Sequence, residues 1–172
     1  MKWLLLILGL LAAVVALMAL IGAFLPRAHR ASRAAAFRQA PGALYAVVRD
    51  FAPATPWQSD LLRAERLPLR DGRVCFREVG RHRAIDYVVL ADQPGERLVL
   101  KIADESLPFG GTWTYDFAPA PDGASVRITE DGEVKNAIFR FLARFVFGYT
   151  GSMDGRLRDL GSRFGETVVP RD

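Results

Sequence analysis

The sequence is poor in the residues from which disulfides, metal centres and catalytic triads are built. Its 172 residues contain one cysteine, Cys75, and two histidines, His29 and His82. One cysteine excludes an intramolecular disulfide and a zinc cluster of thiolates, and two histidines exclude a multi-histidine metal site. We therefore expect no metal and no cofactor. Hydrolysis by a Ser/His/Asp triad would depend on one of two histidines, so the composition points away from it.

Charge is missing from one long stretch near the start of the chain. Residues 3–25 hold no charged side chain. As a helix that rises about 1.5 Å per residue, the stretch reaches about 35 Å and crosses a hydrocarbon core of about 30 Å. We predict a transmembrane anchor over residues 1–25. The alternative is a cleaved signal peptide, but its apolar region is usually about 7–15 residues long and precedes a small-residue cleavage site, whereas Pro26-Arg27 follows here.

Basic residues flank both ends of the predicted anchor. Lys2 precedes it, and Arg27, Arg30, Arg33 and Arg38 follow it. The positive-inside bias favours a single-pass protein with its soluble domain in the cytoplasm. We predict a basic linker over residues 26–32 and one domain over residues 33–172, because nothing later has the composition of a second boundary.

The soluble part begins with short elements and then takes on the pattern of strands. We predict a strand over residues 32–38, a helix from Pro41 to about Asp50, and a short helix or loop that carries Trp57. Between residues 61 and 135, turn signals separate about six short runs. Apolar residues alternate with polar ones in these runs, at Val74, Phe76, Leu98, Leu100, Ile102, Trp113, Tyr115, Phe117, Val126 and Ile128. The alternation predicts an antiparallel sheet with one buried face.

The last segment repeats apolar residues at three- and four-residue steps. The repeat covers residues 136–164 and consists of Ile138, Leu142, Phe145, Tyr149, Met153, Leu157, Leu160 and Phe164. It predicts one long amphipathic helix that lies on the apolar face of the sheet. Asn136 suits its N-cap, and Arg156, Arg158 and Arg163 suit the negative end of its dipole. The order of elements indicates an α+β fold.

This order, together with several short motifs, resembles the helix-grip fold of the START-like, or SRPBCC, superfamily, and within it the polyketide cyclase/dehydrase and lipid-transport branch. The motifs are Ser32-Arg33 to Phe37, Ala40-Pro41, Asp50-Phe51, Pro56-Trp57, Gly111-Thr112-Trp113-Thr114-Tyr115, residues 128–134, and Asn136 with Phe139-Arg140-Phe141. The likeness covers about residues 30–165. Tyr45 departs from a common tryptophan and Ala137 from a frequent proline, and neither change touches the architecture.

The resemblance implies a curved sheet wrapped around the C-terminal helix, with an apolar cavity between them that accepts lipids, sterols or polyketides in relatives. It does not imply catalysis, because the superfamily includes enzymes, carriers and receptors. We expect a hydrophobic small molecule or lipid as the partner. The predicted ligand-binding residues are Trp57, Phe76, Tyr87, Leu100, Trp113, Tyr115, Glu130, Phe141, Phe145 and Tyr149. For each aromatic residue, plain core packing is the alternative.

Three functions remain open at this point. Glu130 shares the strand phase of Val126 and Ile128, which would point it inward as a polar end of the cavity. The alternative, which is commoner for glutamate, is a salt-bridged or solvent-facing side chain. The first hypothesis is a membrane-tethered module that binds a hydrophobic molecule. The second is an enzyme of cyclase or dehydratase type, in which Glu130 or a cavity tyrosine acts as general acid or base. The third is an interaction protein with no ligand.

The start of the last helix is apolar on more than one face. The surplus lies at Phe139, Phe141, Val146 and Phe147. These side chains are expected to gate the cavity, to contact the membrane, or to lie buried beneath loops, while Arg140 and Arg144 are available for lipid phosphates. The net charge of +4 does not predict a nucleic-acid partner, because acidic residues are interspersed with the basic ones. The oligomeric state is left open.

Overall fold

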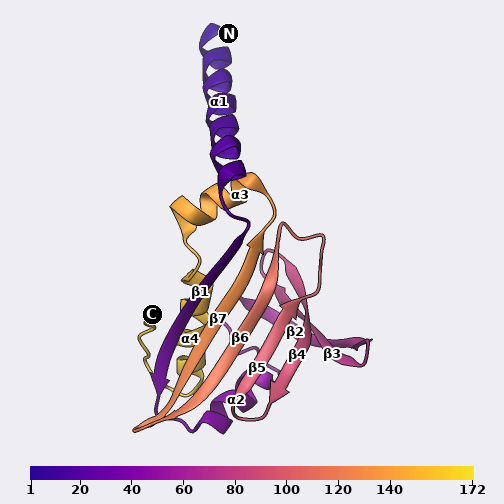
Figure 1. Ribbon diagram of the computed structural model, residues 1–172, viewed down its shortest axis with the longest axis vertical. Coiled ribbons are helices and arrows are strands. Elements are labelled where there is room, and N and C mark those ends of the chain that lie inside the picture. The colour runs from indigo at the N-terminus through magenta and orange to yellow at the C-terminus, as the bar shows by residue number, and fades with distance from the viewer.

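The computed structural model describes residues 1–172, and Figure 1 shows an apolar helix that projects from an α+β domain. The helix α1 (Lys2–Phe24) is long and apolar enough to cross a membrane. The domain consists of β1 (Ala28–Phe37), α2 (Pro41–Arg49), β2 (Leu61–Arg70), β3 (Arg73–Gly80), β4 (Ala84–Gln93), β5 (Arg97–Ile102), β6 (Phe109–Ala120), β7 (Gly123–Val134), α3 (Ala137–Leu142), the π-helical turn η1 (Ala143–Phe147) and α4 (Gly151–Arg163).

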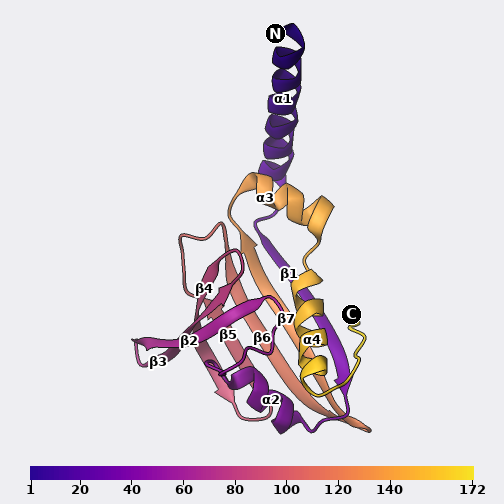
Figure 2. The same cartoon turned by 180° about the vertical axis from the view of Figure 1, so that it is seen from behind.

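The seven strands form one antiparallel sheet in the order β1-β7-β6-β5-β4-β3-β2. Strands that follow one another in the chain are neighbours, except that β1 returns to pair with β7. The sheet is curved, and α2 and α4 lie on its concave face, as Figure 2 shows. This arrangement is the helix-grip fold, so the predicted fold class is confirmed.

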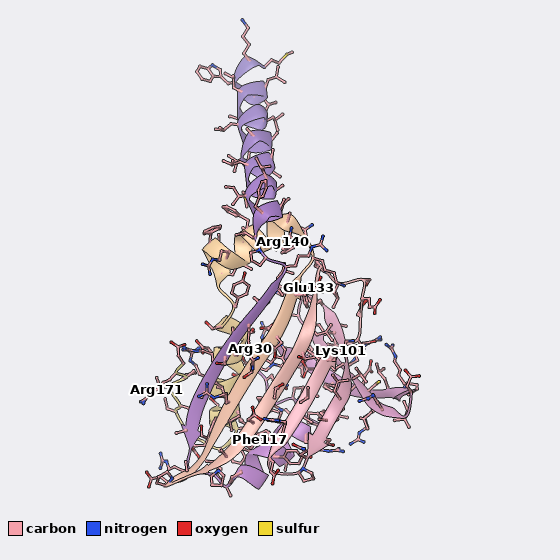
Figure 3. All side chains as sticks on the ribbon, in the orientation of Figure 1. Arg30, Lys101, Phe117, Glu133, Arg140 and Arg171 are labelled. Atoms are coloured by element: carbon pink, nitrogen blue, oxygen red, sulfur yellow. The ribbon has the colours of Figure 1, made fainter.

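The core lies between the concave face and α4. Leu98, Tyr115 and Val126 from the sheet are fully buried against Met153 and Leu157 of α4. On the opposite face of the sheet the side chains are solvated, and Arg30 and Lys101 are labelled there in Figure 3. The predicted alternation is therefore confirmed. Burial of these side chains stabilises the fold by about 25 cal/mol for each Å² of apolar surface removed from water.

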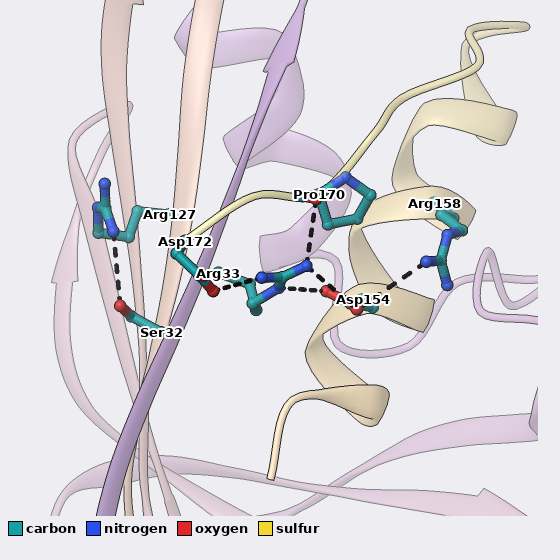
Figure 4. A network of polar contacts seen from close by, with 7 residues as sticks. All are labelled: Ser32, Arg33, Arg127, Asp154, Arg158, Pro170 and Asp172. Atoms are coloured by element: carbon teal, nitrogen blue, oxygen red, sulfur yellow. Dashed lines mark hydrogen bonds and ion pairs between the residues drawn. The ribbon is translucent and has the colours of Figure 1, made fainter. Parts of the chain in front are cut away.

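A polar network ties α4 to the first strand. The guanidinium of Arg33 donates from Nε to Oδ1 of Asp154 at 2.6 Å and from Nη2 to the carbonyl of Pro170 at 3.2 Å. Arg33 also pairs with Asp172, so it joins β1, α4 and the C-terminal segment (Figure 4). A charged side chain on the concave face is tolerated here because its hydrogen bonds are satisfied.

Two elements differ from their predictions. The first strand begins at Ala28, four residues earlier than predicted, so most of the segment assigned to a basic linker is strand. Its pairing with β7 starts at Ala28 opposite Glu133 and continues without a break to Phe37. The charge of Arg30 favoured a linker. In the structure its side chain points to the solvated face, with Nε 3.5 Å from Oδ1 of Asp131.

The predicted long C-terminal helix is wrong. The helix breaks after η1 at Gly148, whose φ of +71° lies in the left-handed region that glycine adopts without steric cost. Only α4 lies on the sheet, whereas α3 packs against the end of α1 (Figure 1). The predicted N-cap is confirmed, since the Asn136 side chain accepts a hydrogen bond from the amide of Phe139 at 3.1 Å.

Candidate ligand-binding cleft

A cleft of about 600 Å³ opens on the concave side, between the β3–β4 turn and the start of α4. Its lining comprises Ser59, Asp60, Leu61, Glu78, Gly80, Arg81, His82, Arg83, Ile85, Phe109, Glu130, Ser152 and Arg156. Only three of these residues, Leu61, Ile85 and Phe109, are hydrophobic. Polar and charged residues therefore outnumber hydrophobic ones in the lining of this cleft, whereas the resemblance led us to expect an apolar cavity.

A buried ion pair forms the floor of the cleft. Arg156 of α4 donates to both carboxylate oxygens of Glu78 on β3, at 3.1 and 2.5 Å. The two side chains are 17% and 10% exposed, respectively. The guanidinium also lies 5.4 Å from the ring centroid of Trp113, in cation–π geometry. Such a bidentate pair fixes the distance between α4 and the sheet at this end.

Gln58 completes the floor from the loop before β2. Its amide nitrogen donates to Oε1 of Glu78 at 3.2 Å, while its own Oε1 is buried without a hydrogen-bond partner. A buried acceptor without a partner is costly, and it needs a water or a ligand donor to satisfy it. Gln58 therefore presents an acceptor to whatever occupies the space beside it.

Behind this floor the interior is filled by side chains. The remaining void has a volume of about 10 Å³, which is about the minimum for one water molecule. Phe51 stacks on Phe76 with ring centroids 4.3 Å apart, and Phe76 stacks on Tyr87 at 5.1 Å. The space between sheet and helix is thus closed, and the open volume lies at the mouth.

The two tyrosines next to the floor are held in their neutral form. Burial raises the pKa of Tyr115 to about 12, although the positive charge of Arg156 opposes the shift. Burial also raises the pKa of Tyr87, and the carboxylate of Glu78 adds to that effect. Near neutral pH both residues can therefore act only as hydroxyl donors and acceptors.

These shifts predict a loss of stability at high pH. The unfolded chain ionises its tyrosines near pH 10, whereas folded Tyr115 keeps its proton until about pH 12. Between these values the unfolded state binds fewer protons, so the free energy of unfolding falls as the pH rises, by about 2–3 kcal/mol for Tyr115. Tyr115→Phe is expected to flatten this fall in denaturant titrations of the full chain in detergent. An unchanged slope would contradict the prediction, and Tyr149→Phe, which lies outside the cluster, serves as control.

Seven of the predicted ligand-binding residues lie at or next to this site. Glu130 lines the open cleft, as its strand phase indicates, and Trp113 lies under Arg156. The small void behind the floor is lined by Trp57, Phe76, Leu100 and Tyr115, with Tyr87 stacked on Phe76. The structure therefore brings these residues together, and their ligand-binding role stays a prediction.

The other three lie elsewhere. Phe145 is 60% exposed, so the prediction that it faces the sheet is wrong, because the helix break at Gly148 separates η1 from α4. Phe141 packs beside it, with ring centroids 5.0 Å apart. Tyr149 stacks on His29 of β1 with centroids 4.1 Å apart.

Two residues of the cleft floor, Arg156 and Gln58, are not among the predicted ligand-binding residues. Arg156 was assigned to the last turns of the helix, but it lies in the second turn of α4 and points inward. The signal was available, because Arg156 follows Met153 by three residues and precedes Leu160 by four, which places all three on one helix face. For Gln58 no local pattern exists, since its burial depends on the fold of the loop 50–60.

Residues 28–165 match the model of the family described as polyketide cyclase/dehydrase and lipid transport. The chain belongs to this family. The polyketide cyclase/dehydrase and lipid-transport family covers the entire sheet together with α4, so the resemblance inferred from the motifs is confirmed. No curated protein matches the chain significantly.

Solved structures show the same fold at low sequence identity. A START superfamily protein from Mycobacterium smegmatis is 14% identical, with a TM-score of 0.59, over 80% of this chain and 97% of that one. A protein from Mesorhizobium loti is 18% identical, with a TM-score of 0.56, over 78% and 93%. The di-domain ARO/CYC StfQ from the steffimycin biosynthetic pathway is 15% identical, with a TM-score of 0.57, over 79% of this chain. The present chain covers 49% of that two-domain protein.

Proposed function

We propose that the protein is a membrane-anchored binding domain that holds an amphipathic small molecule, of lipid, isoprenoid or polyketide-like type, in the polar cleft. The observation that carries this proposal is the cleft itself. Its volume of about 600 Å³ falls within the range of about 300–1,000 Å³ that small-molecule sites occupy. Membership of a family that includes lipid transport supports a small-molecule partner.

The lining defines the chemistry of the ligand. Three carboxylates face three guanidinium groups in the cleft, so their formal charges cancel. The residues are Asp60, Glu78, Glu130, Arg81, Arg83 and Arg156. A balanced lining gives little preference for a strongly charged molecule but offers many hydrogen-bond partners. The ligand therefore carries hydroxyl or carbonyl groups, and Ile85 and Phe109 pack against its carbon skeleton.

The anchor supplies the reason for a membrane-soluble ligand. A helix with the length and hydropathy of α1 holds the domain at the bilayer surface, where amphipathic molecules concentrate. Ser152, on the rim of the cleft, is separated from η1 by only four residues. Exchange between bilayer and cleft then requires movement of one short loop around Gly148.

Filling the cleft tests this function. In titrations of the full chain in detergent with monoolein and with a dihydroxyanthraquinone, native mass spectrometry reports binding. Ile85→Trp is expected to weaken binding at least about tenfold, because the indole takes the place of the ligand. The matched control is Leu90→Trp, on the same strand but exposed outside the cleft. Binding of neither probe, or equal weakening by both variants, would contradict the proposal.

A second candidate function rests on the pair His29 and Glu130. Nε2 of His29 lies 3.7 Å from Oε1 of Glu130, and the two side chains are 13% and 17% exposed. A carboxylate beside an imidazole at the edge of a cleft has the components of a general acid/base pair. Turnover of a bound polyketide-like molecule that is lost in Glu130→Gln while binding persists would favour the enzyme over the carrier.

A further inference from the structure

Four large apolar side chains are exposed together at the end of the domain from which α1 emerges. They belong to α3 and η1, and they are Phe139, Phe145, Val146 and Phe147, with exposed fractions between 47% and 69%. Contiguous exposed apolar residues on a folded domain mark a surface that a membrane or a partner protein covers. The α4 helix and the sheet do not cover them, because Gly148 turns the chain away.

This segment is fastened at both of its ends. Near its start, Nε of Arg140 donates to the carbonyl of Gly22 in α1 at 2.7 Å, and Figure 3 places Arg140 at the base of that helix. Just after its end, the ring of Tyr149 stacks on His29 of β1. A glycine at position 132 leaves room for the imidazole, since a Cβ there would lie 2.3 Å from it. The exposed face is therefore held in a fixed position relative to α1.

A pocket with a mixed polar and apolar lining lies where the anchor meets this segment. It has a volume of about 330 Å³ and is lined by Leu25, Pro26, Ala28, His29, Arg144 and Tyr149. The lining contains one exposed guanidinium and no carboxylate, and both ring nitrogens of His29 are buried without hydrogen-bond partners. The imidazole of His29 lies beside Glu130, with Nε2 3.7 Å from Oε1, so the group in this pocket that attracts an oxyanion is the guanidinium of Arg144.

We propose that α3 and η1 form a seat in the headgroup layer of the bilayer that α1 crosses, with Phe145, Val146 and Phe147 among the acyl chains and an anionic phospholipid headgroup at Arg144. The inference rests on the membrane anchoring in the proposed function. Continuity with the anchor decides the occupant, because α3 packs against the end of α1. A short helix with an apolar face and basic residues beside it is typical of segments that lie in the membrane interface.

The seat assigns a fixed orientation to the domain. A helix that only tethers would let the domain tumble, whereas a seat adjacent to Gly148 keeps the rim of the cleft next to the lipid. The amphipathic ligand then has a direct route between the acyl layer and the cleft.

Depth measurements on the full chain test the seat. Cys75 is buried, so a cysteine introduced on the surface can be labelled selectively with nitrobenzoxadiazole. In vesicles of phosphatidylglycerol and phosphatidylcholine, acyl-brominated lipids are expected to quench a label at Val146→Cys and at Leu11→Cys of α1. A label at Leu69→Cys, which is equally exposed on β2, is expected to escape quenching. Phe147→Cys replaces Val146→Cys if the latter does not fold.

The outcomes separate the seat from the anchor. Quenching at positions 11 and 146 but not 69 supports the seat. Quenching at position 11 alone overturns the seat and leaves the anchor intact. Absence of quenching at position 11 overturns both.

A comparison of two lipid compositions tests the contact between Arg144 and the headgroup. The label at position 146 is expected to be quenched more strongly in vesicles with phosphatidylglycerol than in pure phosphatidylcholine. Arg144→Gln is expected to lose this difference, and Arg163→Gln, an exposed arginine at the end of α4, is expected to keep it. If Arg144→Gln keeps the difference, the headgroup contact is overturned.

Discussion

Replacement of Arg156 by methionine is expected to lower the free energy of unfolding by about 3–5 kcal/mol, because it leaves the carboxylate of Glu78 buried without its partner. Glu78 is only 8% exposed. Without Arg156, the one side chain that still donates a hydrogen bond to its carboxylate is Gln58. Methionine fills much of the volume of the arginine side chain but has no hydrogen-bond donor, so the carboxylate loses both of the bonds that Arg156 donates. Denaturant unfolding of the full chain in detergent measures the loss.

The matched control is Arg158→Met on the same helix. Arg158 is 59% exposed and lies 3.9 Å from Asp154, so its removal is expected to change stability by less than about 1 kcal/mol. Equal losses in the two arginine variants would contradict the prediction. Such a result would mean that water or another polar group solvates the Glu78 carboxylate when Arg156 is absent.

A double replacement separates the fold from the function. Glu78→Leu combined with Arg156→Met removes both charges and fills similar volume, so stability is expected to return to the original level or to exceed it. Binding of the anthraquinone is expected to weaken, because the floor of the cleft has lost the donors of Arg156. Recovered stability without binding would show that the ion pair serves recognition and not the fold.

Local patterns predicted most of the fold but could not predict the polar site. The period-two alternation in β3 and β5 to β7 and the N-cap at Asn136 depend on neighbours in sequence, and both were found in the structure. The pairing of Glu78 with Arg156 joins residues that are 78 positions apart, so no window of sequence contains it. Only the apolar residues on either side of Arg156 hinted that it points inward.

The break in the C-terminal helix shows a second limit. The apolar repeat continues through Phe145 and Tyr149 into α4, so periodicity alone predicts one helix. What ends the helix is competition between surfaces: α3 packs against the end of α1, and α4 packs on the sheet. Gly148 allows the turn between them at positive φ. The same competition explains why Phe145 was expected in the cavity and lies outside it.

Helix α1 and the domain meet at Arg140, and replacement of Arg140 by methionine is expected to loosen the contact between them. Arg140 is only 6% exposed. Its guanidinium donates hydrogen bonds to the carbonyls of Gly22, Val134 and Lys135, at 2.7, 3.2 and 3.0 Å. Each buried acceptor that loses its donor costs roughly 1–3 kcal/mol, so the junction is expected to lose several kcal/mol of local stability. Faster amide hydrogen exchange around residues 22–28 and 134–142 measures this loss.

Spin labels on the two sides of the junction test the mechanical consequence. Cysteines at Leu17 of α1 and Leu69 of β2 are both exposed, and the narrow distance distribution between their labels is expected to broaden in Arg140→Met. Arg163→Met, on the exposed side of α4, is expected to leave it narrow. Close packing of α1 on α3 adds to the hydrogen bonds of Arg140, because a Cβ at Gly22 would lie 1.9 Å from the carbonyl oxygen of Ala137. If the distribution stays narrow in Arg140→Met, this packing alone holds α1 to the domain, and the three hydrogen bonds of Arg140 are dispensable for its orientation.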